Sequence, residues 1–148
     1  MRAVAGLLLV AAAACSSGSL EPVAFDAANE PCRLCRMVGS NGRFAAQLVA
    51  RRQNPLFFDD IGCLRDFLRT RDGVSGEAAA YVVDHRTGDW VPAGQAVYTR
   101  NDELDTPMGS HLLAHGSTAS READPDARGG VALSAAAVFA DLRLPGGL

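Results

Sequence analysis

The chain has 148 residues, of which 48% are hydrophobic and 21% are charged, and its formal net charge is −3 at pH 7. Its 14 basic residues are all arginine and are scattered among 17 acidic residues. No basic stripe of the kind that binds nucleic acid is formed, so we expect no nucleic-acid partner. About 130 residues follow a leader segment, a length that suits one small domain or two very small lobes.

The N-terminus has the features of a bacterial export signal. Arg2 supplies a positive charge, residues 3–14 are an unbroken run of apolar or small residues, and Cys15 follows. Because the run is shorter than the ~20 residues that span a bilayer, we predict a signal peptide over 1–14 and a lipidated Cys15. An ordinary cleaved signal, with Cys15 lost or left as a free thiol, is the alternative. Both place the mature chain in the envelope, facing the periplasm, and residues 15–30 are predicted to be a tether.

The folded domain is predicted to cover residues 31–148. Its first part has two candidate strands, residues 43–50 and 56–59, separated by an Asn-Pro turn. Asp60 is a plausible N-cap for a helix over 61–71, because an apolar stripe with helical spacing follows it. This helix is the clearest local pattern in the chain.

The second part of the chain has shorter patterns. The predicted elements are strands over 80–84, 90–98, 112–114 and 131–133, a short helix over 120–127, and a last helix that begins after Ser134. Pro92 and Gly94 weaken the strand over 90–98. The order strand, strand, helix, strand occurs twice, which predicts an α+β fold of two small β-β-α-β lobes, over about 31–85 and 86–148.

Sulfur ligands are concentrated at the start of the domain. If Cys15 is lipidated, three cysteines remain, and an odd number of thiols cannot all pair within one chain. In an oxidising compartment this favours a thiol that is kept as a ligand or for chemistry. Cys32, Cys35 and Met37 provide two thiols and a thioether, and an extended backbone would point Cys35 and Met37 the same way. Such soft ligands favour Cu(I), although a disulfide or half of a zinc site would also use the two cysteines.

A family resemblance rests on five segments that stand in a characteristic order: PCRLCRM, RFAAQLV, FFDDIGCL, YVVDHRTGDWVPAGQAVY and DTPMGSHLLAH. Over roughly residues 31–130 the chain resembles the accessory lipoproteins of nitrous oxide reductase, the NosL-like family. The resemblance implies a Cu(I)-binding envelope lipoprotein that supplies copper during maturation of nitrous oxide reductase. It also implies two β-β-α-β units related to the organomercurial lyase fold.

The resemblance also implies metal ligands. The Cys-x-Met pair of the family falls on Cys35 and Met37, and Cys32 completes the CxxC that many members carry. The Met-Gly element of the family falls on Met108, whose thioether would come from the second lobe.

Other side chains are weaker candidates for the same site. Cys63 lies in the first turn of the predicted helix and is either a third sulfur ligand, as the FFDDIGCL segment implies, or a small core residue. His111 is either an added imidazole ligand or a solvated surface residue, and His85 and His115 are weaker still. Asp59 is expected to end a strand, with the binding of a partner as the alternative.

Three functions of different class follow from these features. A copper carrier that is not an enzyme is favoured by the sulfur ligands, the predicted lipid and the order of the motifs, with nitrous oxide reductase and its assembly factors as expected partners. The second is a zinc-stabilised module that uses Cys32, Cys35, Cys63 and one histidine. The third is an enzyme, either a thiol-disulfide oxidoreductase or a lyase. The CxxC does not open a helix after a strand, which argues against the former, and similar folds host unrelated functions, which argues against the latter.

Overall fold

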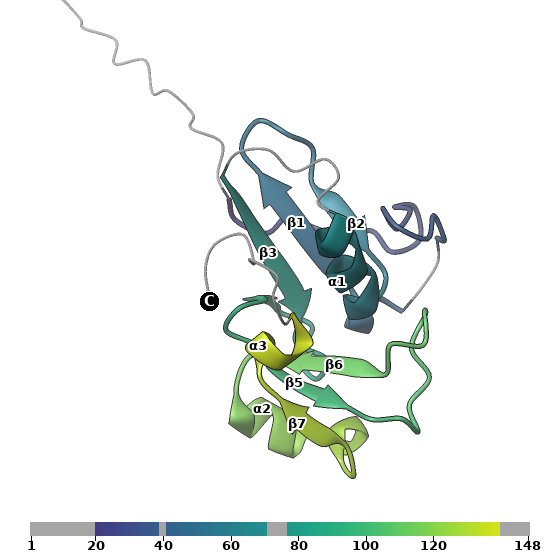
Figure 1. The fold of residues 1–148 in the computed structure, drawn as a ribbon, viewed down its shortest axis with the longest axis vertical. Coiled ribbons are helices and arrows are strands. Elements are labelled where there is room, and N and C mark those ends of the chain that lie inside the picture. The colour runs from purple at the N-terminus through teal and green to yellow at the C-terminus, as the bar shows by residue number, and fades with distance from the viewer. Residues whose placement is uncertain (1–19, 39–40, 71–76, 140–148) are drawn as a thin grey trace, which may run out of the picture.

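The computed structural model describes residues 20–38, 41–70 and 77–139, whose strands form two antiparallel sheets (Figure 1). In chain order the elements are η1 (Gly42–Phe44), β1 (Ala46–Ala50), β2 (Leu56–Phe58), α1 (Ile61–Thr70), β3 (Ala78–Val83), β4 (Trp90–Pro92), β5 (Val97–Arg100), β6 (Leu112–His115), α2 (Thr118–Ala123), η2 (Pro125–Ala127), β7 (Val131–Leu133) and α3 (Ala135–Val138). Helices and antiparallel sheets together confirm the predicted α+β class.

The two sheets share one plan of strand order. The first sheet has the order β2-β1-β3-β4 and the second has the order β6-β5-β7. In the first sheet, β1 lies between β2, the next strand in the chain, and β3, which follows α1. In the second sheet, β5 lies in the same way between β6 and β7, which follows α2. Strand β4 lies beyond the predicted lobe boundary near residue 85, yet it pairs with β3 and belongs to the first sheet. Leu48 of the first sheet and Tyr98 of the second share one hydrophobic cluster. The division into two lobes therefore stays a prediction.

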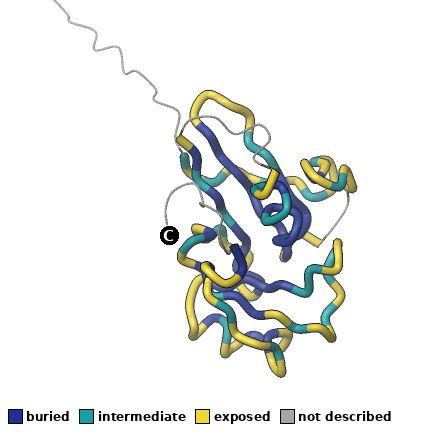
Figure 2. The backbone as a smooth tube through the Cα atoms, in the orientation of Figure 1, coloured by how far each residue is buried: buried dark blue, intermediate teal, exposed yellow. Residues whose placement is uncertain are grey.

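Strand β1 is buried along its whole length, as the continuous dark trace in Figure 2 shows. Its alternate residues Ala46, Leu48 and Ala50 belong to the main core cluster. The same cluster contains Ile61 and Leu64 of α1, because successive side chains of a strand point to opposite faces and this helix covers one of them. Both faces of β1 are covered, so its sequence AQLVA lacks the alternation of a half-exposed strand.

The other face of the first sheet is covered by the segment that precedes the predicted domain. Gln47, Phe57 and Tyr81 are cross-strand neighbours on this face. The buried Gln47 amide exchanges two hydrogen bonds with the backbone of Val23, at 3.0 and 3.1 Å. Phe25 stacks on Phe57 with ring centroids 5.1 Å apart, and the Tyr81 hydroxyl donates to the carbonyl of residue 20. The described part of the predicted tether thus lies against the sheet.

Helix α1 begins at the residue predicted for it. The Asp60 carboxylate accepts a hydrogen bond from the backbone N–H of Gly62 at 2.6 Å, which satisfies one of the free donors at the helix N-terminus. Ile61, Leu64 and Phe67 are buried along one stripe. The stripe fixes the orientation of the helix on the sheet, and with it the direction of the neighbouring Cys63 side chain.

The predicted strand over 90–98 is wrong, because the structure divides this segment between the two sheets. Residues 90–92 form β4 and pair with β3, whereas residues 97–100 form β5 and pair with β6 and β7. Pro92 lacks a backbone N–H for a ladder, and its carbonyl instead accepts hydrogen bonds from Gln95 and Ala96 in the turn that joins the sheets. Likewise, the predicted strand over 43–50 begins as η1, which the Asn41 side chain caps. Across the described ranges, no helix has the length and apolar character needed to cross a membrane.

Candidate metal centre

Cys32 and Cys35 lie in a closed turn at the edge of the first sheet. The Cys32 N–H donates to the carbonyl of Met37 at 2.9 Å, and Arg36 adopts a positive φ of 67°. The Arg33 N–H donates to the carbonyl of Phe57 at 2.7 Å, which fixes the turn to β2. An extended backbone was the condition for Cys35 and Met37 to point the same way, and it is not met, because the turn reverses the chain between Cys32 and Met37.

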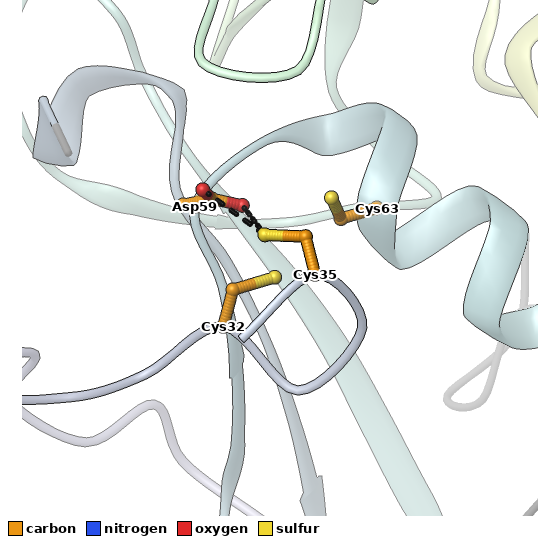
Figure 3. Close-up of side chains that lie close together, drawn as sticks. All are labelled: Cys32, Cys35, Asp59 and Cys63. Carbon is orange, nitrogen blue, oxygen red and sulfur yellow. Dashed lines mark hydrogen bonds between the residues drawn. The ribbon is translucent and has the colours of Figure 1, made fainter. Parts of the chain in front are cut away.

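Four side chains from three short segments converge beside this turn (Figure 3). Cys32 and Cys35 come from the turn, Asp59 from the end of β2 and Cys63 from the first turn of α1. One ligand atom from each lies within 4.8 Å of all the others. All three cysteines are free, and Cys35 Sγ lies 3.5 Å from both carboxylate oxygens of Asp59. Cys32 and Cys63 are buried, whereas Cys35 is partly exposed and opens the cluster to solvent.

The ionisation of these four groups is interdependent because they are so close. A hydrogen bond from the Cys63 thiol lowers the pKa of Cys32, and the same interaction raises the pKa of Cys63. Burial raises the pKa of Cys35, and it raises the pKa of Asp59 to about 6. These interactions favour ionisation of Cys32 and resist ionisation of the other three groups. A bound cation would relieve that resistance and release the remaining thiol protons.

The donor set of the cluster fits a soft or borderline metal ion. Three thiols are the ligands that Cu(I) and Zn(II) prefer, and a carboxylate is an accepted zinc ligand but a poor one for Cu(I). Asp59 was predicted to end a strand, with the binding of a partner as the alternative, so its place in the cluster is an addition to the predicted ligands. The sequence around Asp59 gave little indication of this role, since the side chain reaches the thiols only once β2, α1 and the turn are packed together.

The two predicted thioethers lie at the surface next to this cluster. Met37 and Met108 are each 46% exposed. Met37 and Asp59 line an open cleft of about 460 Å³ together with the loop over residues 105–107, which immediately precedes Met108. The Met108 N–H donates to the Asp60 carboxylate at 3.0 Å, so the loop is held to the N-terminus of α1. The part of each methionine as a ligand stays a prediction.

His111 has a fixed orientation in the same loop region. Its Nδ1 lies 2.8 Å from the carbonyl oxygen of Leu104, which can only accept, so Nδ1 carries the proton and Nε2 of the neutral ring keeps its lone pair. His85 and His115 lie together elsewhere, beside Asp124. The predicted lipidation residue, Cys15, lies outside the described residues.

Replacing Asp59 with asparagine is expected to speed the alkylation of Cys35 by iodoacetamide at mildly alkaline pH. After burial and the Cys32 interaction, the negative charge of Asp59 also raises the pKa of Cys35, so its removal increases the thiolate fraction. Less than one unit of pKa change would give an increase of roughly two- to tenfold, which mass spectrometry of the alkylated peptide measures. Asp66→Asn, at an exposed position of α1, is the matched control. An unchanged rate in Asp59→Asn would show that this charge does not act on the thiol.

The fold and the cluster together define a small α+β protein with a cysteine-rich potential metal site. The NosL family model matches residues 22–142, most of the chain, and the chain belongs to the NosL family. This family is copper-binding and is associated with the maturation of nitrous oxide reductase. No curated protein and no solved structure matches the chain. The family resemblance expected from the five motifs is confirmed.

Proposed function

We propose that this protein is a copper chaperone of the bacterial envelope, which binds one Cu(I) ion and delivers it for the assembly of a copper enzyme. The observation that carries the proposal is the convergence of three free thiols within 4.8 Å of one another, in a member of a copper-binding family. The recipient that the family favours is the copper centre of nitrous oxide reductase, reached together with its assembly factors. Lipid on Cys15 would hold the chaperone at the membrane, facing the periplasm.

The proposed ligands are the thiolates of Cys32, Cys35 and Cys63. Cu(I) is stable with two or three soft ligands and needs no octahedral cage. The thioether of Met37, which lines the cleft, and that of Met108, which follows the loop over residues 105–107, are proposed as further, weaker ligands. His111 is proposed as a last possible ligand, which would bind through Nε2.

A carrier must bind its ion tightly and yet allow a recipient ligand to enter. Support for this role comes from the unequal exposure of the sulfurs, since Cys32 and Cys63 are buried while Cys35 is partly exposed. The open cleft beside Asp59 leaves room for an incoming ligand on the side of Met37. A site in which every ligand was buried would hold the ion but would exchange it slowly.

A structural zinc site is the second candidate, because three cysteines and a carboxylate also form a zinc ligand set. The two functions are separated by titrating the reduced protein without oxygen, with Cu(I) against a competing chelator and with Zn(II) in parallel. Tight one-to-one Cu(I) binding that Zn(II) does not displace is the expected result. Zn(II) that binds in preference to Cu(I) and is lost in Cys35→Ser, and therefore occupies the thiols, would reject the carrier and establish the zinc module.

Replacing Met37 with leucine is expected to weaken Cu(I) binding by about tenfold, or about 1.4 kcal/mol, because leucine keeps the apolar volume but lacks the soft sulfur. The competition titration measures the change, and the thermal midpoint should stay the same since Met37 is largely exposed. Replacing the adjacent exposed Val38 with leucine is the matched control. An unchanged affinity in Met37→Leu would remove this thioether from the ligand set.

A further inference from the structure

A second group of potential ligands lies away from the cysteine cluster. His85, His115 and Asp124 are all buried, and one ligand atom from each lies within 4.8 Å of the other two. His85 Nδ1 and His115 Nε2 lie 2.8 and 2.9 Å from the same oxygen, Oδ2 of Asp124. Both rings therefore direct a nitrogen to one point, and their planes lie at 68° to each other.

Each member of this group is held by a different part of the fold. His85 follows β3, and its N–H donates to the carbonyl of Ala114 at 2.8 Å. His115 ends β6 in the other sheet. Asp124 follows α2, and its second oxygen, Oδ1, accepts a hydrogen bond from the N–H of Asp126 at 3.0 Å. The three ligand atoms are therefore held close together before any ion binds.

We propose that His85, His115 and Asp124 form a second metal site, which takes a divalent ion of borderline softness such as Zn(II). Two neutral imidazoles and one carboxylate are a ligand set that Zn(II) uses, with a fourth position left for solvent or another ligand. The set contains no sulfur, so it selects against the Cu(I) that the cysteine cluster favours. The protein would then hold two ions of different class in two separate places.

Binding of the ion requires a change of tautomer in both imidazoles. Each ring must free the nitrogen that faces Asp124 and carry its proton on the other nitrogen. For His85 that other nitrogen, Nε2, lies 3.9 Å from the Asp126 carboxylate, which is beyond hydrogen-bond distance but near enough to become its acceptor after a small movement. For His115 it is the buried Nδ1, which has no hydrogen-bond partner among the described residues.

The adjustment needed to admit an ion is small. Ligand atoms around tetrahedral Zn(II) are roughly 3.3 Å apart, given metal–ligand distances of about 2.0–2.1 Å. The Asp124 oxygen would therefore move back by about half an ångström from its present distances of 2.8 and 2.9 Å to the two nitrogens. Because His85 follows a strand of the first sheet and His115 ends one of the second, the ion would cross-link the two sheets.

Co(II) titration of the reduced protein without oxygen tests this site, because Co(II) replaces Zn(II) and its spectrum reports the ligands. The expected result is one equivalent of tetrahedral Co(II) whose visible bands come without a thiolate charge-transfer band. His115→Gln should lose this equivalent and keep any thiolate-bound Co(II), whereas Cys35→Ser should show the reverse. Zn(II) affinity should fall by at least about 100-fold in His115→Gln and by about tenfold in Asp126→Asn. Asp102→Asn, at an exposed position outside both ligand groups, is the control.

A readout that needs no variant keeps the test decisive if His115→Gln fails to fold. In the wild-type protein, Zn(II) should shift the NMR signals of the His85 and His115 rings. The signals of His111, which is bound to the Leu104 carbonyl, should not change. If no sulfur-free Co(II) equivalent forms and no ring signal moves, the three side chains are a hydrogen-bonded group only, and the second metal site does not exist. That result would leave the cysteine site untouched.

Discussion

Replacing Cys35 with serine is expected to abolish tight Cu(I) binding while the domain stays folded. The hydroxyl of serine is a hard donor and a poor ligand for Cu(I), so a loss of at least about 100-fold, or about 2.8 kcal/mol, should result. Serine keeps the shape of the side chain and can still donate to Asp59, as the thiol does now. Because Cys35 is only partly buried, the cost in unfolding free energy should be about 1 kcal/mol or less.

Competition titration and chemical denaturation measure the two effects of Cys35→Ser separately. Leu34→Ser is the matched control, because Leu34 lies in the same turn, is exposed and carries no sulfur. Full Cu(I) affinity in Cys35→Ser would mean that the ion binds elsewhere. A loss of affinity in both variants would mean instead that the turn, and not the thiol, had been disturbed.

Replacing Asp60 with alanine is expected to lower the free energy of unfolding by roughly 3 kcal/mol, the second large effect. Its buried carboxylate accepts hydrogen bonds from Gly62 N–H at 2.6 Å, from the Thr106 hydroxyl at 2.8 Å and from Met108 N–H at 3.0 Å. Alanine would remove the helix cap, worth about 0.5–2 kcal/mol. It would also leave buried donors without an acceptor, at about 1–3 kcal/mol.

The effect of Asp60→Ala is measured by urea denaturation. Asp66→Ala, at an exposed position of the same helix, should change stability by only about 0.5 kcal/mol. Asp60→Asn, which keeps an acceptor oxygen, should fall between the two. A loss under 1 kcal/mol in Asp60→Ala would show that the helix and the loop of Met108 do not depend on this carboxylate. The loop of Met108 packs closely on the helix N-terminus, because a Cβ on Gly62 would come within 2.7 Å of Ser110. This close packing supports the expected dependence of both elements on Asp60.

Helix α1 was predictable from the sequence because its signals are local. The cap and the apolar stripe lie within a few residues of each other, and the predicted first residue is the one observed. The segment over 90–98 was not, because β4 and β5 both have strand-like composition and only their partners separate them. Pro92 and Gly94 marked the weak point without showing that the chain passes there from one sheet to the other.

The candidate site was predictable in its residue types and less so in its geometry. The CxxC and the family motifs identified Cys32 and Cys35 as ligands. For Cys63 they left two roles open, a third sulfur ligand or a small core residue. The approach of Asp59 to Cys35 spans 24 residues of sequence, and no local pattern records such a contact. The direction of Met37 depends on Arg36 at a positive φ, a conformation that is uncommon for a residue other than glycine.

If Cys15 carries the proposed lipid, the docking of the N-terminal segment on the first sheet would limit the distance between the domain and the membrane. Residue 20 already receives a hydrogen bond from Tyr81, and Val23 is held by Gln47. With the proposed lipid on Cys15, only five residue steps join the anchor to the folded surface, a reach of at most about 18 Å. The anchored protein would then stay close to the bilayer surface. Membrane-bound partners would meet it easily, whereas a freely diffusing enzyme would have to approach the lipid surface to collect its ion.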